Sequence, residues 1–152
     1  MKKVAASSLS VMVGASLCLS SLVCAQELPL TVKPNVGTAQ KHVRTISMDE
    51  YRTLVGNPGS ALIVDVREPQ EYAAGHVPRA INIPRGLIES QIWNHVGSPD
   101  KADKERPIIL QCQSGKRATL ASQTLQELGF THTTAVIMNL GDWQKAGNPF
   151  VR

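Results

Sequence analysis

Cys112 and the two cations that follow it are the residues whose types and spacing suggest chemistry. They lie in the stretch ILQCQSGKRATLASQTL, residues 109–125, where an apolar segment runs into the cysteine. Lys116 and Arg117 come shortly before a helical pattern, and Gly115 lets the intervening loop take a positive φ. The loop can therefore curl around the sulfur with its backbone N–H groups turned inward, which is the geometry of an anion-binding nest.

This loop is predicted to activate the cysteine as a nucleophile. The positive end of the following helix and the two loop cations would stabilise a thiolate, and they would hold a small dianion against it. The alternative is a buried, inert core residue, which is common for lone thiols. The neighbouring polar residues favour an accessible thiol, so we expect a nucleophile that acts on an anion. These neighbours are Gln111, Gln113, Ser114 and Lys116.

The first 25 residues are predicted to be a signal peptide. MKK is a short basic start, residues 4–23 are apolar, and VCA places Val23 and Ala25 at the positions that signal peptidase recognises. The mature chain would then begin at Gln26 and be exported, to the periplasm. An uncleaved membrane anchor is the alternative, because the apolar run is nearly long enough to span a bilayer.

Loss of residues 1–25 would change both the charge and the cysteine content. The segment carries two lysines and no acid, so 152 less 25 leaves 127 residues, and the net charge falls from +4 to +2. This weak excess gives no reason to expect a nucleic-acid or membrane partner for the mature chain. Cys18 and Cys24 leave with the signal, and the remaining Cys112 can form neither an internal disulfide nor a thiolate zinc site. We expect no metal and no cofactor.

Short apolar segments alternate with helical ones through the rest of the chain. Residues 26–42 are polar and without a period, and we expect an N-terminal arm there. Ser47 and Glu50 have the spacing of a capping box at a helix start. Strands are expected at ALIVDV, AINIP, IILQ and TTAVIM, and further helices at EPQEYAAG, GLIESQIWNHV, Ala118–Leu128 and DWQKAG.

This alternation predicts an α/β fold with a parallel sheet covered by helices on both faces. Ligands of such sheets bind beyond the carboxyl ends of the strands. Cys112 directly follows the apolar segment IIL and Gln111. The expected fold and the loop chemistry therefore point to the same place.

Two motifs resemble those of the rhodanese family. LIVDVREPQEYAAGHVPRAINIP, residues 62–84, is similar to the family pattern Asp-x-Arg, Glu-Tyr, Gly-His-x-Pro-x-Ala-x-Asn-x-Pro, and CQSGKRA is similar to the family's active-site loop. The resemblance implies a rhodanese-like domain over residues 43–152, built on a five-stranded parallel sheet with helices on both faces. It also implies sulfurtransferase activity, in which a cysteine takes the outer sulfur of thiosulfate as a persulfide and passes it to cyanide or a thiol.

The resemblance also assigns roles to individual residues. Cys112 matches the family nucleophile, and Arg67 matches a motif arginine that faces the active site in some members. Asp65 corresponds to a loop anchor at a strand end. His76 is expected to be a turn residue held by backbone rather than a catalytic base. The residues expected to cradle the substrate are Gln113, Ser114, Gly115, Lys116 and Arg117.

The sequence departs from the family pattern at two places. Arg79 stands where the family often has glycine, and Gly141 is followed at once by Asp142 and Trp143, so the turn beside the site looks shortened. We expect Asp142 to cap a helix and Trp143 to pack, and the shortened turn leaves pocket shape and acceptor choice open.

The sequence leaves two other functions open. Phosphatases and arsenate reductases of the same fold need a wider loop, Cys-x5-Arg, whereas Cys112 and Arg117 are separated by four residues. A non-catalytic partner-binding module or a persulfide carrier is the second alternative. The expected partners are a small anionic sulfur donor and a thiol or cyanide acceptor, with a thioredoxin-like protein as one form of the thiol.

Overall fold

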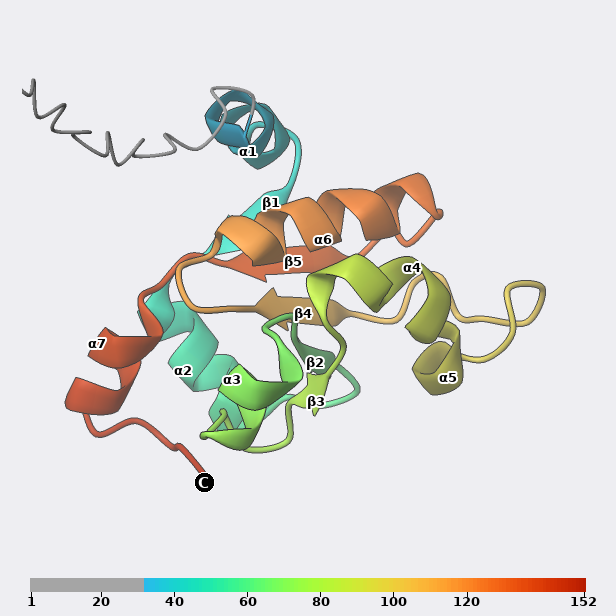
Figure 1. Cartoon of the computed structure of the whole chain (residues 1–152). Helices are drawn as coiled ribbons and strands as arrows, with labels where there is room; N and C mark the ends of the chain where they lie inside the picture. The colour runs from blue at the N-terminus through green and yellow to red at the C-terminus, as the bar shows by residue number, and fades with distance from the viewer. Residues whose placement is uncertain (1–31) are drawn as a thin grey trace, which may run out of the picture.

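The computed structural model describes residues 32–152 (Figure 1). The expected signal-peptide boundary at residues 25 and 26 lies outside this part of the chain. In chain order the elements are α1 (Val32–Gln40), β1 (Arg44–Ile46), α2 (Met48–Gly56), β2 (Leu62–Asp65), α3 (Pro69–Ala73), β3 (Ile81–Asn82), the 3₁₀ helix η1 (Arg85–Leu87), α4 (Ile88–Gln91), α5 (Trp93–Val96), β4 (Ile108–Gln111), α6 (Lys116–Glu127), β5 (Thr133–Val136) and α7 (Leu140–Lys145).

The five strands form one sheet in the order β1-β5-β4-β2-β3, and every described pair is parallel. This confirms the predicted five-stranded parallel sheet. β4 lies at its centre, with Leu110 opposite Val64 of β2 and Ala135 of β5. All four β4 side chains are buried, as expected for a strand covered on both faces.

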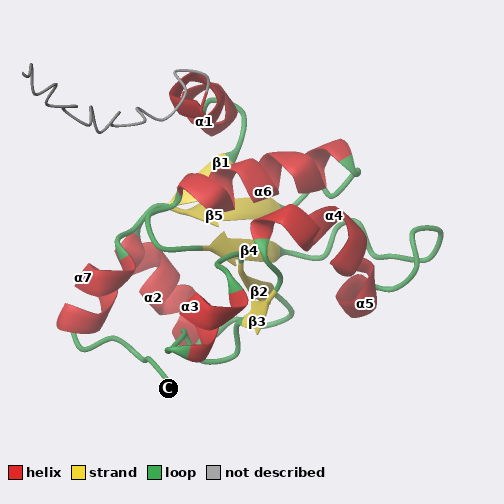
Figure 2. Cartoon of the chain, in the orientation of Figure 1, coloured by secondary structure: helices red, strands yellow, loops and turns green. Residues whose placement is uncertain are grey.

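Side chains alternate between two apolar cores, one on each face of the sheet. On β4, Leu110 belongs to the core that includes Ala121 of α6, and Ile109 belongs to the core that includes Tyr51 of α2 and Trp143 of α7. Figure 2 shows the matching layers, with α4 and α6 on one side of the sheet and α2 and α7 on the other. The predicted covering of both faces is confirmed.

A local sequence signal explains where α2 begins. The predicted capping box is present at α2, where the Ser47 hydroxyl accepts from the Glu50 N–H and the Glu50 carboxylate accepts from the Ser47 N–H. The helix expected over residues 86–96 is instead divided into η1, α4 and α5. Gly97, with φ 95°, ends the last of these pieces.

The polar arm expected over residues 26–42 is in part a helix. α1 occupies Val32–Gln40, and its Ala39 is 1% exposed. α1 packs beside α6, so tertiary contact stabilises a segment that has little helical pattern of its own. Within residues 32–152, no helix is long and apolar enough to cross a membrane.

Candidate active site

Cys112 is the first residue beyond β4, at the carboxyl end of the central strand. The expectation of an accessible thiol is wrong, because Cys112 is 1% exposed and Gln111 is 0% exposed. The Cys112 side chain belongs to the core on the α6 face, together with Ala118 and Ala121. Within the loop that follows, Gln113, Ser114 and Lys116 are exposed.

Gly115 gives the loop its shape. Its φ is 84°, in the left-handed region that favours glycine, and it forms the N-terminal boundary of α6. A β-carbon at this position would lie 2.9 Å from Cδ1 of Ile137 and 3.0 Å from the carbonyl oxygen of Val136. Both the backbone angle and the contact with the end of β5 therefore require glycine here.

The backbone N–H groups from Gln113 to Arg117 donate to no carbonyl or side chain within residues 32–152. The loop carbonyls, by contrast, are engaged. The Gly115 carbonyl accepts from the N–H and the hydroxyl of Thr119, at 2.9 and 3.0 Å, and the Gln113 carbonyl accepts from the N–H of Leu140 at 3.0 Å. A row of available donors at the positive end of the twelve-residue helix α6 is an arrangement suited to an anion.

Arg117 forms an ion pair that the sequence reasoning missed. Its Nη1 lies 2.6 Å from Oε2 of Glu71 and its Nη2 lies 2.8 Å from Oε1, so the contact is bidentate. Glu68 is more distant, at 3.9 Å. The hydrogen bonds from Arg117 lower the pKa of Glu71 to about 2. The two acids of the EPQE segment, three residues apart, were the only sequence signal for this contact.

Arg67 lies in a buried ion pair with Asp65, with Nη2 and Oδ2 2.6 Å apart. Its other contacts are the carbonyls of Glu71 and Gly75, at 3.1 and 2.8 Å. The Asp65 carboxylate also accepts from the Arg67 N–H at 3.0 Å, as expected for a loop anchor. Arg67 thus holds the segment after β2, and its proposed contact with substrate stays a prediction.

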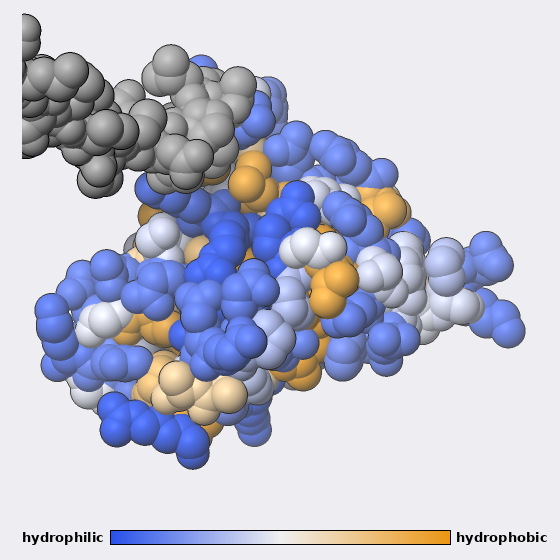
Figure 3. All heavy atoms as spheres, viewed as in Figure 1, coloured by the Kyte–Doolittle hydropathy of each residue, from blue (hydrophilic) through white to orange (hydrophobic). Residues whose placement is uncertain are grey.

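Lys116 differs from Arg117 in its surroundings. It is exposed at the start of α6, and it forms no ion pair with the part of the chain that the structure describes. Figure 3 shows hydrophilic atoms gathered over α3 and the first turn of α6, where these charges lie. The structure therefore brings Cys112 and the predicted loop residues together, with Lys116 as the cation still available to a ligand.

Three smaller expectations can be compared with the structure. Nδ1 of His76 lies 3.1 Å from the Tyr72 carbonyl, and the His76 N–H donates to the Val151 carbonyl, so His76 is a turn residue as predicted. α7 is capped by Asn139, whose side chain accepts from the Gly141 N–H, and the predicted capping role of Asp142 is wrong. Trp143 is fully buried, as predicted.

No group of three or more potential metal ligands occurs among residues 32–152.

A cavity of about 510 Å³ lies away from the cysteine loop. Its lining includes Arg44 at the start of β1, Pro107 just before β4 and Thr133 at the start of β5. These positions mark the amino ends of the strands, opposite to the carboxyl ends where α/β sheets bind ligands. We therefore assign the candidate active site to the Cys112 loop.

The parallel α/β sheet, with a cysteine in the loop after its central strand, has the fold and the site of a rhodanese-like domain. The family model for the Rhodanese-like domain matches residues 47–146, and the chain belongs to this family.

Sulfurtransferases are among the relatives. The thiosulfate:glutathione sulfurtransferase of Saccharomyces cerevisiae is 29% identical over 114 residues, covering 70% of this chain and 81% of the relative. The human thiosulfate:glutathione sulfurtransferase is 36% identical over 94 residues, covering 57% and 81%. A Rhodopseudomonas palustris structure, described as a possible tyrosine phosphatase of unknown function, matches with a TM-score of 0.68 and 25% identity, covering 83% and 98%. At the level of the family, the relatives support a sulfurtransferase.

Proposed function

We propose that this protein is a sulfurtransferase that carries sulfur as a persulfide on Cys112. The observation that supports this most directly is the row of available N–H groups from Gln113 to Arg117, which follows the cysteine at the positive end of α6. Such donors stabilise negative charge on sulfur and on an approaching anion. The proposed donor is thiosulfate or a related anion, and the proposed acceptor is cyanide or a thiol.

The transfer would occur in two half-reactions. In the first, the Cys112 thiolate attacks the outer sulfur of thiosulfate, a new S–S bond forms, and the S–S bond within thiosulfate breaks. Sulfite leaves with the electron pair of that bond, and the persulfide keeps one negative charge. In the second half-reaction, cyanide or a thiolate attacks the terminal sulfur and the Cys112 thiolate is restored, so no external oxidant or reductant is needed.

The loop residues would share the work of binding. The backbone N–H groups of Gln113, Ser114 and Gly115 would hold the terminal sulfur, and the exposed ammonium of Lys116 would attract the donor. Arg117 would add its charge while it remains held by Glu71. The cysteine, the backbone N–H groups and the two cations would together supply the groups that the two half-reactions use.

Phosphate-ester chemistry is less well supported. An oxyanion-binding arginine needs guanidinium donors directed at the ligand, whereas two donor groups of Arg117 are directed at Glu71. The separation of four residues between Cys112 and Arg117 also gives a small ring. A module without catalysis would need neither the cysteine nor the available N–H groups.

We also propose that the mature chain is exported to the periplasm, where a thioredoxin-like protein could supply the thiol. The basis is the sequence alone: MKK, the apolar run and VCA before Gln26. N-terminal sequencing of protein recovered from the cell envelope should begin at Gln26. Intact Met1 on cytoplasmic protein would contradict the proposal.

The persulfide can be tested by mass. Purified mature protein mixed with thiosulfate and no acceptor should gain the mass of one sulfur atom, and cyanide should then remove it. Cys112→Ser should abolish both changes, because a hydroxyl is too weakly ionised to attack sulfur at neutral pH. Sulfur transfer that survives in this variant, or faster hydrolysis of phosphate esters than sulfur transfer in the parent, would overturn the proposed function.

A further inference from the structure

Two acids and two cations lie at the candidate active-site loop, and we call these four residues the rim. Glu68 and Glu71 lie at the start of α3, and Lys116 and Arg117 form the first turn of α6. Nη1 of Arg117 lies 3.9 Å from the carboxylate of Glu68 and 2.6 Å from the carboxylate of Glu71. Lys116 is exposed. The four charges sum to zero, so this rim is not the strongly cationic one that the sequence of the loop alone would indicate.

Glu71 is fixed in this position by its own helix. Its Oε2 accepts from the Glu68 N–H at 3.1 Å, as part of a capping box, and its carbonyl accepts from Nη1 of Arg67 at 3.1 Å. Arg67 in turn is held by the buried carboxylate of Asp65. The Glu71 carboxylate is therefore a built part of the rim rather than a freely moving surface acid.

Arg117 belongs to the first turn of α6, which follows the loop of the nucleophile. The hydrogen bonds to Glu71 are the main cause that raises the pKa of the Arg117 guanidinium, and negative charge at Cys112 raises it further. Both partners are only partly buried, with side-chain exposures of 32% for Arg117 and 36% for Glu71, so a bound anion would feel both charges. The negative charge of Glu71 thus acts on the same space as the positive charge of Arg117.

The geometry points to Glu71 as a specificity-determining residue. Its carboxylate weakens the preference of the site for doubly charged sulfur donors and so favours donors with a single negative charge, such as a simple alkyl persulfide or a thiosulfonate. This inference rests on the proposed function and refines it. The loop N–H groups can bind the terminal sulfur of either kind of donor. The extra charge of a dianion, by contrast, meets the exposed cation Lys116 and the carboxylates of Glu68 and Glu71.

Two donors that differ in charge can test this inference. Thiosulfate is a dianion and releases sulfite, whereas methanethiosulfonate is a monoanion and releases methanesulfinate. Both present a terminal sulfur that the Cys112 thiolate attacks, and both leave the same persulfide. The quantity to measure is kcat/KM for thiosulfate divided by kcat/KM for methanethiosulfonate, with cyanide as acceptor.

Glu71→Gln keeps the side-chain length and an acceptor for Arg117 but removes the charge. The ratio should rise, on the order of three- to tenfold at low ionic strength, and the rise should shrink in high salt. Glu127→Gln is the matched control, because it removes the same charge at the far end of α6, about 15 Å along the helix from Arg117. It should leave the ratio unchanged.

Further variants separate charge from structure. Arg117→Gln should lower the ratio, and the double variant E71Q/R117Q should return it to the parental value. If E71Q does not fold, Glu68→Gln should give a smaller rise of the same sign, because its carboxylate is farther from Arg117. An unchanged ratio in an active E71Q protein, or an equal loss with both donors, would overturn this inference alone. A parent that accepts sulfur from neither donor would overturn the proposed function as well.

Discussion

The guanidinium of Arg67 and the carboxylate of Asp65 form a buried ion pair at the end of β2, with Nη2 and Oδ2 2.6 Å apart and side-chain exposures of 5% and 0%. The same guanidinium donates to the carbonyls of Glu71 and Gly75. The amide of Asn82, on the neighbouring strand β3, donates to the carbonyls of Asp65 and Arg67. This network fixes the segment that presents Glu71 to the cysteine loop.

Replacement of Arg67 should strongly destabilise the fold. Arg67→Ala leaves the buried carboxylate of Asp65 without its ion-pair partner and with only the N–H of residue 67 as donor. Loss of one member of a buried pair costs about 3–5 kcal/mol. The free energy of unfolding, measured by urea titration followed by circular dichroism, should fall by this amount. Asp65→Asn with Arg67 retained should also be destabilising.

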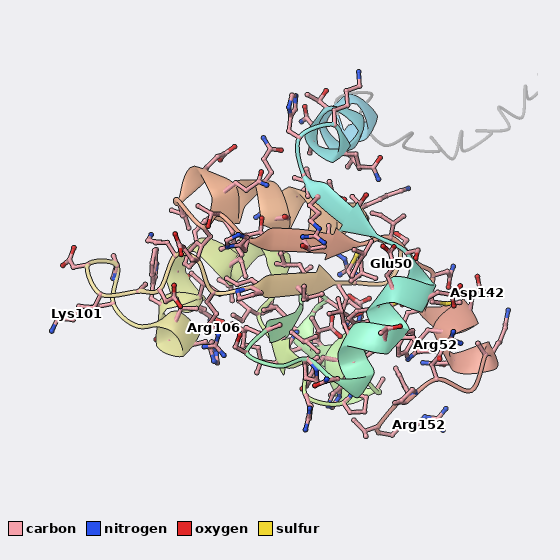
Figure 4. The ribbon with its side chains drawn as sticks, turned by 180° about the vertical axis from the view of Figure 1, so that it is seen from behind. Glu50, Arg52, Lys101, Arg106, Asp142 and Arg152 are labelled. Atoms are coloured by element: carbon pink, nitrogen blue, oxygen red, sulfur yellow. The ribbon has the colours of Figure 1, made fainter. Side chains whose placement is uncertain are left out.

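An exposed pair provides the control for Arg67. Arg52 lies 3.3 Å from Asp49 on α2, and both side chains are exposed, at 59% and 77%. Figure 4 labels Arg52 beside α2. Arg52→Ala should cost less than about 1 kcal/mol, as is usual for surface pairs. A similar loss in both variants would show that burial of the Arg67 pair has no special effect.

Gly115→Ala should damage both stability and sulfur transfer. A residue with a β-carbon pays about 1–2 kcal/mol in the left-handed region, and the new atom would press against Ile137 and the Val136 carbonyl. The loop N–H groups would be displaced as the strain is relieved. Gly86→Ala is the control, since nothing lies within 4 Å of a β-carbon there. Equal unfolding midpoints for the two variants would contradict this account.

The ion pair of Glu71 should make stability depend on pH. Its folded pKa, about 2, is below the ordinary value of 4.5, so its contribution is fully present above pH 4.5 and is lost as the pH falls through 2. The difference in unfolding free energy between the parent and E71Q should therefore be largest near neutral pH and shrink between pH 4.5 and 2. A difference that stays constant over this range would mean that Glu71 titrates normally.

Much of the fold could be predicted because its signals are local. The apolar segment at β4, the Ser47 and Glu50 capping box and the repeat in α6 each depend on neighbours in the sequence. β1 was not found from its pattern, because three residues with burial only at Ile46 carry no alternation. α1 was missed because its stability comes from packing beside α6.

The contacts of the candidate site could not be predicted from the sequence, although the place of its cysteine after a strand could. The position of Cys112 at a strand end follows from the order of elements, whereas its burial depends on how α6 covers the sheet. The pairing of Arg117 with Glu71 joins residues 46 apart in the sequence. Such a contact is set by the packing of α3 beside the start of α6, and no local pattern encodes it.

Lys116 should control the binding of anionic donors. It is the exposed cation of the loop, and within residues 32–152 it forms no ion pair, so its charge is available to thiosulfate. Lys116→Ala should raise KM for thiosulfate about three- to tenfold with little change in kcat, because a rim charge acts on association rather than on the transfer itself. Steady-state kinetics with cyanide as acceptor would measure both constants.

Salt and a distant lysine complete this test. Screening weakens the attraction of an exposed charge, so raising the ionic strength should increase KM of the parent more than KM of Lys116→Ala. Lys101→Ala removes an equal charge at the tip of a loop far from α7 and the cysteine loop (Figure 4), and its KM should match that of the parent. If Lys116→Ala folds normally and keeps the parental KM, the ammonium does not contact the donor, and the binding role proposed for Lys116 is wrong.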